Sequence, residues 1–260
     1  MNSEELFRKI TELLSERKTI ALCTVIEKIG SGPRDIGAKM IVYDDGKTMG
    51  SIGGGHIERI IVKEALKAIK ENKSREITLS LGSGEGIETG LICGGSIRIF
   101  IDIINPKPRL IIIGSGNIAK PLAEIANIVG FDVIIVDDNM ETATKNRFPM
   151  VSKIIVNQLT KGIEELDIKS EDFIAIVHGD VEKEYEVLKK ILKTKVRYLG
   201  LLGSKRKSSE IKRRLIEEGY NKEDVEKIHS PIGLDIGAET PEEIAVSITA
   251  ELIAVLRGKI

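Results

Sequence analysis

Short apolar runs alternate with helical patterns along the second half of the chain. Branched apolar residues predict five strands, at 110–113, 133–136, 153–156, 173–177 and 198–202. Apolar residues at helical spacing predict the intervening helices, at 118–129, 160–165, 182–192 and 205–218. This alternation predicts a parallel sheet with helices on both faces. A last helix is expected near 241–257, with Thr240 as its N-cap and Pro241 at its first position.

In the first part of the chain, the predicted helices and strands do not alternate regularly. Helices are expected at 3–15 and 57–70, and strands at 20–26, 40–43, 76–81 and 97–104. Prolines at 106 and 108 interrupt the pattern between two strands and mark a domain boundary. The sequence therefore predicts an α/β protein: a small α+β domain at 1–105, followed by a Rossmann-like parallel-sheet domain at 109–260.

Composition narrows the class of protein. The chain has 260 residues, 42% of them hydrophobic and 30% charged, as in ordinary soluble domains. A net charge of −1 and few aromatic residues argue against a nucleic-acid partner. No apolar run reaches the roughly 18 residues of a membrane span. Two cysteines without a pairing pattern indicate the reducing cytoplasm, and Cys23, inside a strand, is expected in the core.

A dinucleotide-binding fingerprint follows the first strand of the second domain. The run G-x-G-x-x-A places Gly114 at a tight turn and Gly116 where a pyrophosphate would approach the backbone. Asn117 lies in the same turn, and Asp137 ends the next strand at the offset expected for a ribose-binding acid. An acid there favours a ribose without a 2′-phosphate. The alternative is a βαβ turn of the same shape that binds nothing.

Three glycine-rich loops lie in the first domain, at 30–39, 50–56 and 82–95. Such loops place backbone N–H groups close to a ligand, often a phosphate. We expect Gly53, Gly54 and Gly55 to hold an oxyanion at the start of a helix, with Arg34 as a bidentate clamp. Tight turns between short strands are the alternative.

Two further residues of this domain are candidates for chemistry. His56 follows the triple glycine and is either a substrate contact and general acid or a helix cap, while Glu58 complements the helix dipole. Three histidines in the chain exclude a His-rich metal centre. Cys93, followed by two glycines, is either a metal or sulfur-transfer ligand or a packing residue.

Two loops of the second domain follow strands at the edge where α/β sheets bind ligands. His178 and Asp180 come after the fourth strand and are expected near the cofactor crevice, or as helix caps. Ser204 follows the fifth strand and is expected to contact an anion. We interpret Lys207, one turn later, as part of a solvated basic patch.

These motifs together resemble the XdhC/CoxI family, accessory factors of xanthine dehydrogenase and related molybdenum hydroxylases. The likeness lies in the runs 30–34, 37–40, 50–55, 93–95, 114–116, 198–207, 231–238, 240–245, 247–248 and 250–251. It implies that the chain binds molybdenum cofactor (molybdopterin), assists its sulfuration, and delivers it to an apo-hydroxylase. A cysteine desulfurase and a second copy of the chain are the further partners it suggests. The nucleotide of the Rossmann domain is then the cofactor's own or a separate NAD(P).

The chain departs from the family at two positions. Many members have cysteine where this chain has His56, which leaves Cys93 as the expected metal contact, and many have histidine at Asn117. We expect a cofactor chaperone rather than a catalyst and assign no catalytic residue. An NAD-dependent oxidoreductase using His178 or His56, and a nucleotide-sensing module, are the alternatives. The apolar stripe of the last helix, which contains Ile248 and Leu252, forms either a dimer face or a contact within its own domain.

Overall fold

The computed structural model describes residues 3–30, 34–81, 87–88 and 95–260. The chain divides into two compact units, Met1–Lys107 and Pro108–Ile260, each with its own hydrophobic core.

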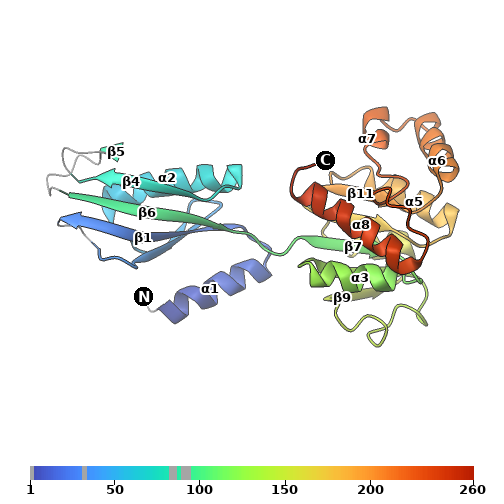
Figure 1. Cartoon of the computed structure of the whole chain (residues 1–260), viewed down its shortest axis with the longest axis horizontal. Helices are drawn as coiled ribbons and strands as arrows, with labels where there is room; N and C mark the ends of the chain where they lie inside the picture. Colours follow the sequence, from blue (N-terminus) through green and yellow to red (C-terminus); the bar gives the residue numbers. More distant parts are fainter. Residues whose placement is uncertain (1–2, 31–33, 82–86, 89–94) are drawn as a thin grey trace. The chain divides into compact units, whose positions relative to one another are not determined.

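A mixed sheet forms the N-terminal unit, with strand order β3-β2-β1-β6-β4-β5. Its strands are β1 (Ile20–Gly30), β2 (Lys39–Tyr43), β3 (Thr48–Gly50), β4 (Arg75–Ser80), β5 (Ile87–Glu88) and β6 (Gly95–Ile104). Helices α1 (Ser3–Ser15) and α2 (Gly55–Glu71) cover opposite faces of this sheet (Figure 1). Successive side chains of β1 point to opposite faces of the sheet, which explains why both faces are apolar. Ile20 packs under α1, while Ala21 and Cys23 pack under α2.

The C-terminal unit is a five-stranded parallel sheet with strand order β11-β10-β7-β8-β9. Its strands are β7 (Arg109–Ile113), β8 (Asp132–Asp137), β9 (Lys153–Val156), β10 (Phe173–Ile176) and β11 (Tyr198–Leu201). Numbered along the chain, the order is 3-2-1-4-5, that of the Rossmann fold. The order reverses between β7 and β10, so the crevice for a ligand is expected beyond Ile113 and Ile176.

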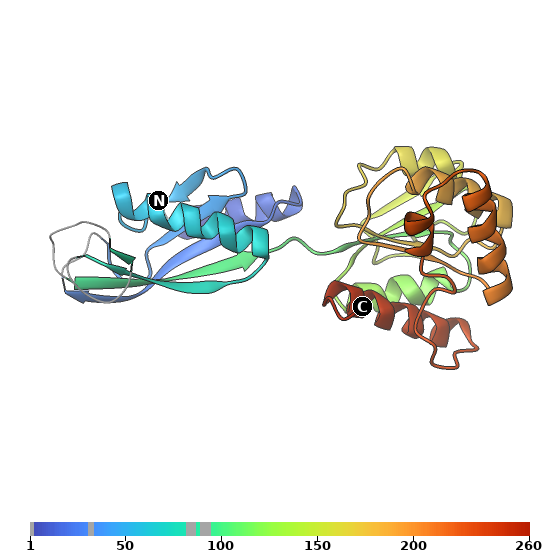
Figure 2. The same cartoon turned by 90° about the horizontal axis from the view of Figure 1, so that it is seen from above.

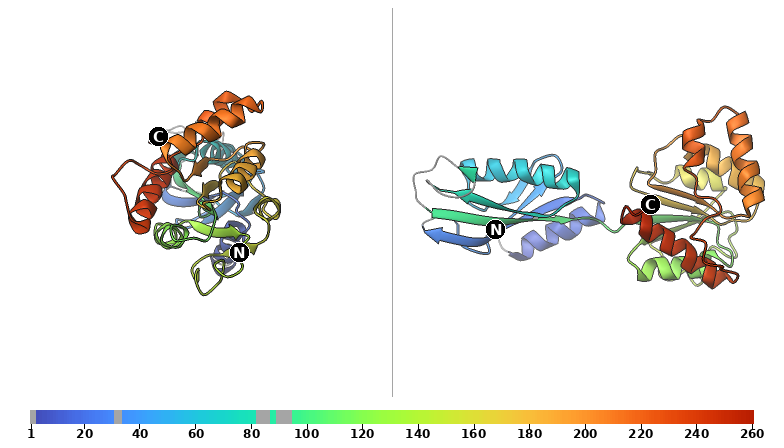
Figure 3. Two further views of the ribbon diagram at one scale, coloured as in Figure 1. Left: turned by 90° about the vertical axis from the view of Figure 1, so that its right-hand side faces the viewer. Right: turned by 45° about the horizontal axis from the view of Figure 1, so that its top comes forward.

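Helices cover both faces of this sheet (Figure 2). One face carries α3 (Ala119–Ile128) and α8 (Pro241–Leu256). The other face carries α4 (Leu159–Glu164), α5 (Val181–Ile191), α6 (Lys205–Glu217) and α7 (Lys222–Glu226), as a further view shows (Figure 3). The predicted α/β class, with a Rossmann-like parallel sheet, is confirmed.

Helix α8 begins and packs as its sequence indicates. Thr240 accepts a hydrogen bond from the Glu243 N–H, and the Glu243 carboxylate accepts one from the Thr240 N–H, which makes a capping box. Ile248 and Leu252 are fully buried against the parallel sheet and α3. The apolar stripe of the last helix therefore packs within its own domain and is not available as a dimer face.

Some elements differ from the sequence-based expectation. Strand β1 continues to Gly30 past a register shift between Val25 and Glu27, and neither β3 nor α7 was expected. Cys23 is fully buried in the core, as expected, and burial raises the pKa of its thiol to about 12. Within the described residues, no helix is both long enough and apolar enough to cross a bilayer.

Candidate functional site

The fingerprint turn at the end of β7 requires glycine at its first position. Gly114 has φ +116°, and a Cβ there would lie 2.8 Å from the Cα of His178. Gly114 thus allows the loops that follow β7 and β10 to touch. A Cβ on Gly116 would meet nothing within 4 Å, and Gly116 and Asn117 are both exposed. The turn therefore leaves open space where the fingerprint predicts a phosphate.

Arg147 fixes the orientation of this turn. Its Nε donates to the Ser115 carbonyl oxygen at 3.2 Å, and its Nη2 donates to that of Gly116 at 3.3 Å. In a trans peptide the C=O of one residue is opposite the N–H of the next. The N–H groups of Gly116 and Asn117 are therefore directed away from the guanidinium.

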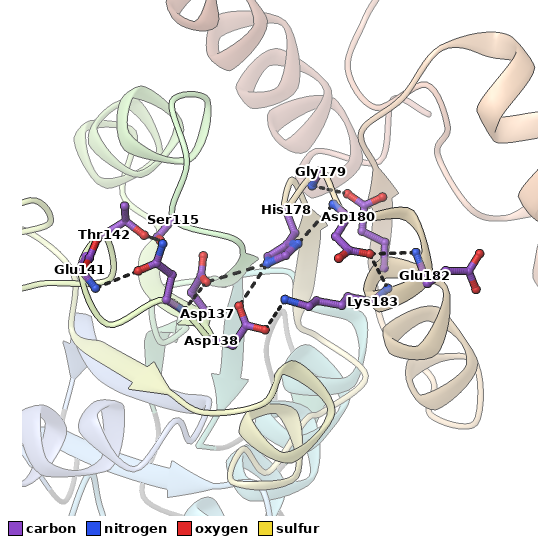
Figure 4. Close-up of polar contacts among 12 residues, drawn as sticks. Ser115, Asp137, Asp138, Glu141, Thr142, His178, Gly179, Asp180, Glu182 and Lys183 are labelled. Carbon is purple, nitrogen blue, oxygen red and sulfur yellow. Dashed lines mark hydrogen bonds and ion pairs between the residues drawn. The ribbon is translucent and has the colours of Figure 1, made fainter.

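A second contact from the same β8–β9 connection holds the turn. The hydroxyls of Ser115 and Thr142 lie 2.5 Å apart in a hydrogen bond (Figure 4). Arg147 was not predicted as a site residue, because the residues around it in the sequence form no motif. The long connection between β8 and β9 was the one available signal.

Two acids, the last residue of β8 and the one after it, lie beside this turn. Asp137 is 4% exposed, and its Oδ1 accepts a hydrogen bond from the Asn139 N–H at 2.8 Å. Asp138 is more exposed and pairs with Lys183 Nζ at 2.6 Å. That hydrogen bond is the main cause of the lowered pKa of Asp138, to which His178 also contributes. Asp137 lies where the fingerprint places a ribose-binding acid.

His178 extends from the end of β10 toward both acids (Figure 4). Its Nε2 lies 3.4 Å from Asp138 Oδ1 and 3.9 Å from Asp137 Oδ1. The Asp180 N–H donates to His178 Nδ1 at 3.3 Å, so the proton of the neutral ring is on Nε2. The side chain is thus held with Nε2 as a hydrogen-bond donor toward the two acids.

This cluster also satisfies a distance criterion for a metal site. Ligand atoms of Asp137, Asp138 and His178 lie within 4.8 Å of one another. The protonated Nε2 offers no lone pair to a metal, however, and the Lys183 ammonium already neutralises Asp138. Asp137 as an acceptor and His178 Nε2 as a donor therefore fit a neutral polar group, such as a pair of hydroxyls, better than they fit a cation.

The remaining predicted residues of this edge cap helices. Asp180 Oδ1 accepts hydrogen bonds from the first-turn N–H groups of α5, and Ser204 Oγ accepts one from the Lys207 N–H in α6. The helix cap was one of the two expectations for Asp180, whereas the capping role of Ser204 was not expected. Their contacts to a ligand stay predictions.

Lys207 is not part of a solvated basic patch, so that interpretation was wrong. Its ammonium forms an ion pair with Glu184 and donates to the Leu202 carbonyl oxygen at 3.1 Å. Glu184 is fully buried, and its other carboxylate oxygen accepts from the Gly179 N–H at 2.8 Å. Glu184 therefore joins the loop after β10 to the loop after β11, a role that sequence spacing does not indicate.

In the N-terminal unit, the carboxylate of Glu58 binds the second glycine-rich loop, at 50–56. Glu58 Oε1 accepts hydrogen bonds from the Ser51 hydroxyl at 2.7 Å, the Gly54 N–H at 2.9 Å and the Ile52 N–H at 3.1 Å. Partial burial favours the protonated form, but these hydrogen bonds outweigh it and lower the pKa of Glu58. Glu58 thus serves as the anion at this loop.

Of the other predicted residues of this unit, Gly54 contacts Glu58 through its N–H. His56 is exposed in the first turn of α2, and Arg34 is exposed ahead of β2. Gly53, Gly54 and Gly55 form the entry to α2, with Gly54 and Gly55 at positive φ. Cys93 falls outside the described residues.

Each of the two units matches a known protein-family model. The XdhC Rossmann domain model covers residues 110–252, and the XdhC and CoxI family model covers residues 13–82. A solved structure described as a xanthine dehydrogenase from Bacillus halodurans is 25% identical, with a TM-score of 0.56 over 97% of this chain and 96% of that one.

Curated relatives show the same likeness. The molybdenum cofactor insertion chaperone PaoD of Escherichia coli K12 is 25% identical over 96% of this chain and 87% of its own. A protein of Bacillus subtilis 168, named as a probable xanthine dehydrogenase subunit, is 34% identical over 60% of this chain and 45% of its own. The Escherichia coli K12 protein YqeB is 33% identical over 96% of this chain, which spans 46% of it. The chain thus covers about half the length of the last two relatives. It belongs to the XdhC and CoxI family, and its C-terminal unit is an XdhC Rossmann domain.

Proposed function

We propose that the protein is an accessory factor that binds molybdenum cofactor and assists its sulfuration and insertion into a hydroxylase of the xanthine dehydrogenase type. The likeness to a molybdenum cofactor insertion chaperone, over 96% of this chain and 87% of that one, carries the proposal. The cofactor is cargo, handed on to the apo-hydroxylase.

The Rossmann crevice is the proposed site for the nucleotide part of the ligand. Open space at Gly116 and the N–H groups turned away from Arg147 suit a phosphate. Asp137 would accept hydrogen bonds from ribose hydroxyls, and His178 would donate from Nε2. NAD(P) is the alternative nucleotide, and Asp137 favours NAD over NADP.

The N-terminal unit is the proposed site for the part of the cofactor that carries the metal. Cys93 is the residue we propose to contact molybdenum, since a thiolate is the soft ligand in this part of the sequence. His56 would lie near it by analogy with the cysteine that relatives carry at that position. A cysteine desulfurase would then be the sulfur donor for the bound cofactor.

Reconstitution of an apo-hydroxylase tests the proposal. Apo-enzyme, molybdenum cofactor prepared without oxygen, and a sulfur source are mixed with and without the protein, and hydroxylase activity is measured. We expect the protein to increase the yield of active enzyme, and Cys93→Ala to reduce that increase. Equal yields with and without the protein would contradict an insertion role.

A second function is favoured by one observation, the hydrogen bond that His178 Nδ1 accepts from the Asp180 N–H, which assigns the proton of the neutral ring to Nε2. That arrangement suits the proton donor of an NAD-dependent carbonyl reductase. Incubation with NADH and a panel of aldehydes and ketones separates the two functions. Turnover that His178→Gln abolishes would favour the reductase, and no turnover would leave the accessory role.

A further inference from the structure

Two glycine-rich segments that are separate in the sequence meet at one cavity of the N-terminal unit. The cavity has a volume of about 420 Å³. Strand pairing brings the segments together, since β2 lies between β1 and β3 and the Ser51 N–H donates to the Lys39 carbonyl oxygen. The lining consists of Arg34, Gly37, Ala38, Lys39, Gly50 and Ser51, with Ser3 and Leu6 of α1.

The cavity carries an excess of positive charge. Arg34 and Lys39 are the two charged residues of its lining. Among the described residues, neither forms an ion pair with a carboxylate, and Lys39 Nζ donates only to the Gly37 carbonyl oxygen, at 3.1 Å. Asp35, the acid closest in sequence, pairs with Lys28 at 2.8 Å. The two cations that line the cavity are thus not engaged in ion pairs within the part of the chain that the structure describes.

The nearby triple glycine is a poorer anion site than this cavity. Glu58 already accepts hydrogen bonds from the N–H groups of Ile52 and Gly54, and its lowered pKa keeps it charged at neutral pH. A second anion on those N–H groups would be repelled by this carboxylate. The Ser51 hydroxyl also donates to Glu58, which leaves the guanidinium and ammonium as the charged donors of the cavity.

We infer that this cavity binds a phosphate monoester group, through a bidentate contact from Arg34 and a point-charge contact from Lys39. Guanidinium matches the geometry of a phosphate, and an ammonium adds charge with little directional demand. The inference rests on the proposed function for its natural ligand, because molybdopterin carries such a phosphate. In this inference the side chains of Arg34 and Lys39, and not the N–H groups of the triple glycine, donate hydrogen bonds to the anion.

Titration of the full chain with inorganic phosphate, in a buffer free of other oxyanions, tests the site. Binding is followed by calorimetry for the wild type, Arg34→Gln and Lys39→Gln. Arg59→Gln is the matched control, because it removes an exposed arginine of the same unit that does not line the cavity. Thermal melts verify that each variant is folded, which is expected because Arg34 is exposed.

We expect phosphate to bind the wild type, about tenfold weaker binding for Arg34→Gln, a smaller loss for Lys39→Gln, and no change for Arg59→Gln. Absence of phosphate binding, or an equal loss in Arg34→Gln and Arg59→Gln, would overturn the inference.

A parallel titration with anaerobic molybdenum cofactor separates this inference from the proposed function. If phosphate binds through Arg34 but the cofactor does not bind, the phosphate site stands and the proposed function fails. If the cofactor binds Arg34→Gln as tightly as the wild type, the proposed function stands and the phosphate site is overturned. Equal relative losses for both ligands in Arg34→Gln would support both.

Discussion

Gly114 and His178 touch where the order of the parallel strands reverses, and a side chain on Gly114 would lie 2.8 Å from the His178 Cα. The contact ties the fingerprint turn to the loop that carries the hydrogen-bond donor. Gly114→Ala combines a strained φ with a backbone clash, so we expect it to lower the free energy of unfolding by about 2–4 kcal/mol. Chemical denaturation measures this loss.

Gly116→Ala is the matched control for that prediction. Its Cβ would meet no protein atom within 4 Å, so we expect a change in the free energy of unfolding of about 0.5 kcal/mol or less. Nucleotide affinity should fall, because the added methyl occupies the space proposed for the phosphate. Equal destabilisation by both substitutions would show that the space at Gly116 does not exist.

Arg147 is expected to act on nucleotide binding through the backbone. Arg147→Gln removes the hydrogen bonds to the Ser115 and Gly116 carbonyl oxygens, so the N–H groups of the turn lose their alignment. We predict larger backbone motion at Gly116 and Asn117 in the free protein, measured as lower NMR order parameters, and about tenfold weaker binding of ADP.

Arg257→Gln, at the exposed end of α8, is the control and should change neither quantity. Lower order parameters without weaker ADP binding would retain the structural role of Arg147 and contradict nucleotide binding at this turn. Unchanged order parameters would contradict the structural role itself.

Lys207 lies in the basic segment 205–207, yet we expect it to stabilise the folded protein. Lys207→Ala leaves the charge of Glu184 buried without its partner, which we expect to cost about 3–5 kcal/mol of unfolding free energy. Lys205→Ala, at an exposed position of the same helix, should cost about 0.5 kcal/mol or less.

A double variant separates the charge from the packing at this position. Glu184→Gln with Lys207→Met removes both charges and keeps an acceptor for the Gly179 N–H. It should recover much of the stability lost in Lys207→Ala. A Lys207→Ala protein as stable as the wild type would contradict the buried ion pair.

The contribution of Glu58 should depend on pH in a defined direction. Its pKa in the folded protein is below the ordinary value of 4.5, so its stabilising effect is complete above about pH 4.5. The effect is lost as the pH falls through the lower pKa of the folded state. Glu58→Gln should therefore be about 1–2 kcal/mol less stable than the wild type at pH 7, with a smaller difference at low pH.

Glu71→Gln, an exposed acid at the end of the same helix, is the control and should show little difference at either pH. A Glu58→Gln difference that stays constant from pH 7 to pH 3 would contradict the charged hydrogen-bond acceptor at the glycine loop.

The sequence predicted those features that depend on local pattern. The strand–turn–helix at Gly114 and the N-cap at Thr240 are each set by residues a few positions apart, and both agree with the structure. Asp137 lies at the end of β8, as expected, while its ligand stays a prediction.

Contacts between distant segments could not be predicted in this way. Arg147 lies 32 positions from the Ser115 carbonyl oxygen that it binds, and Glu184 lies 23 positions from Lys207. Neither pair has a characteristic spacing or belongs to a sequence motif. The residues of each pair come together only when the loops pack on the folded sheet. Lys207 was misread for this reason, since a cation beside other cations gives no sign of a buried partner.

Equilibrium binding of molybdenum cofactor tests the central claim most directly. Cofactor prepared without oxygen is titrated into the full chain and into Cys93→Ala, and bound molybdenum is counted by elemental analysis after gel filtration. The account predicts that molybdenum travels with the wild-type protein and that Cys93→Ala binds it more weakly. Wild-type protein that elutes free of molybdenum at every cofactor concentration would contradict it.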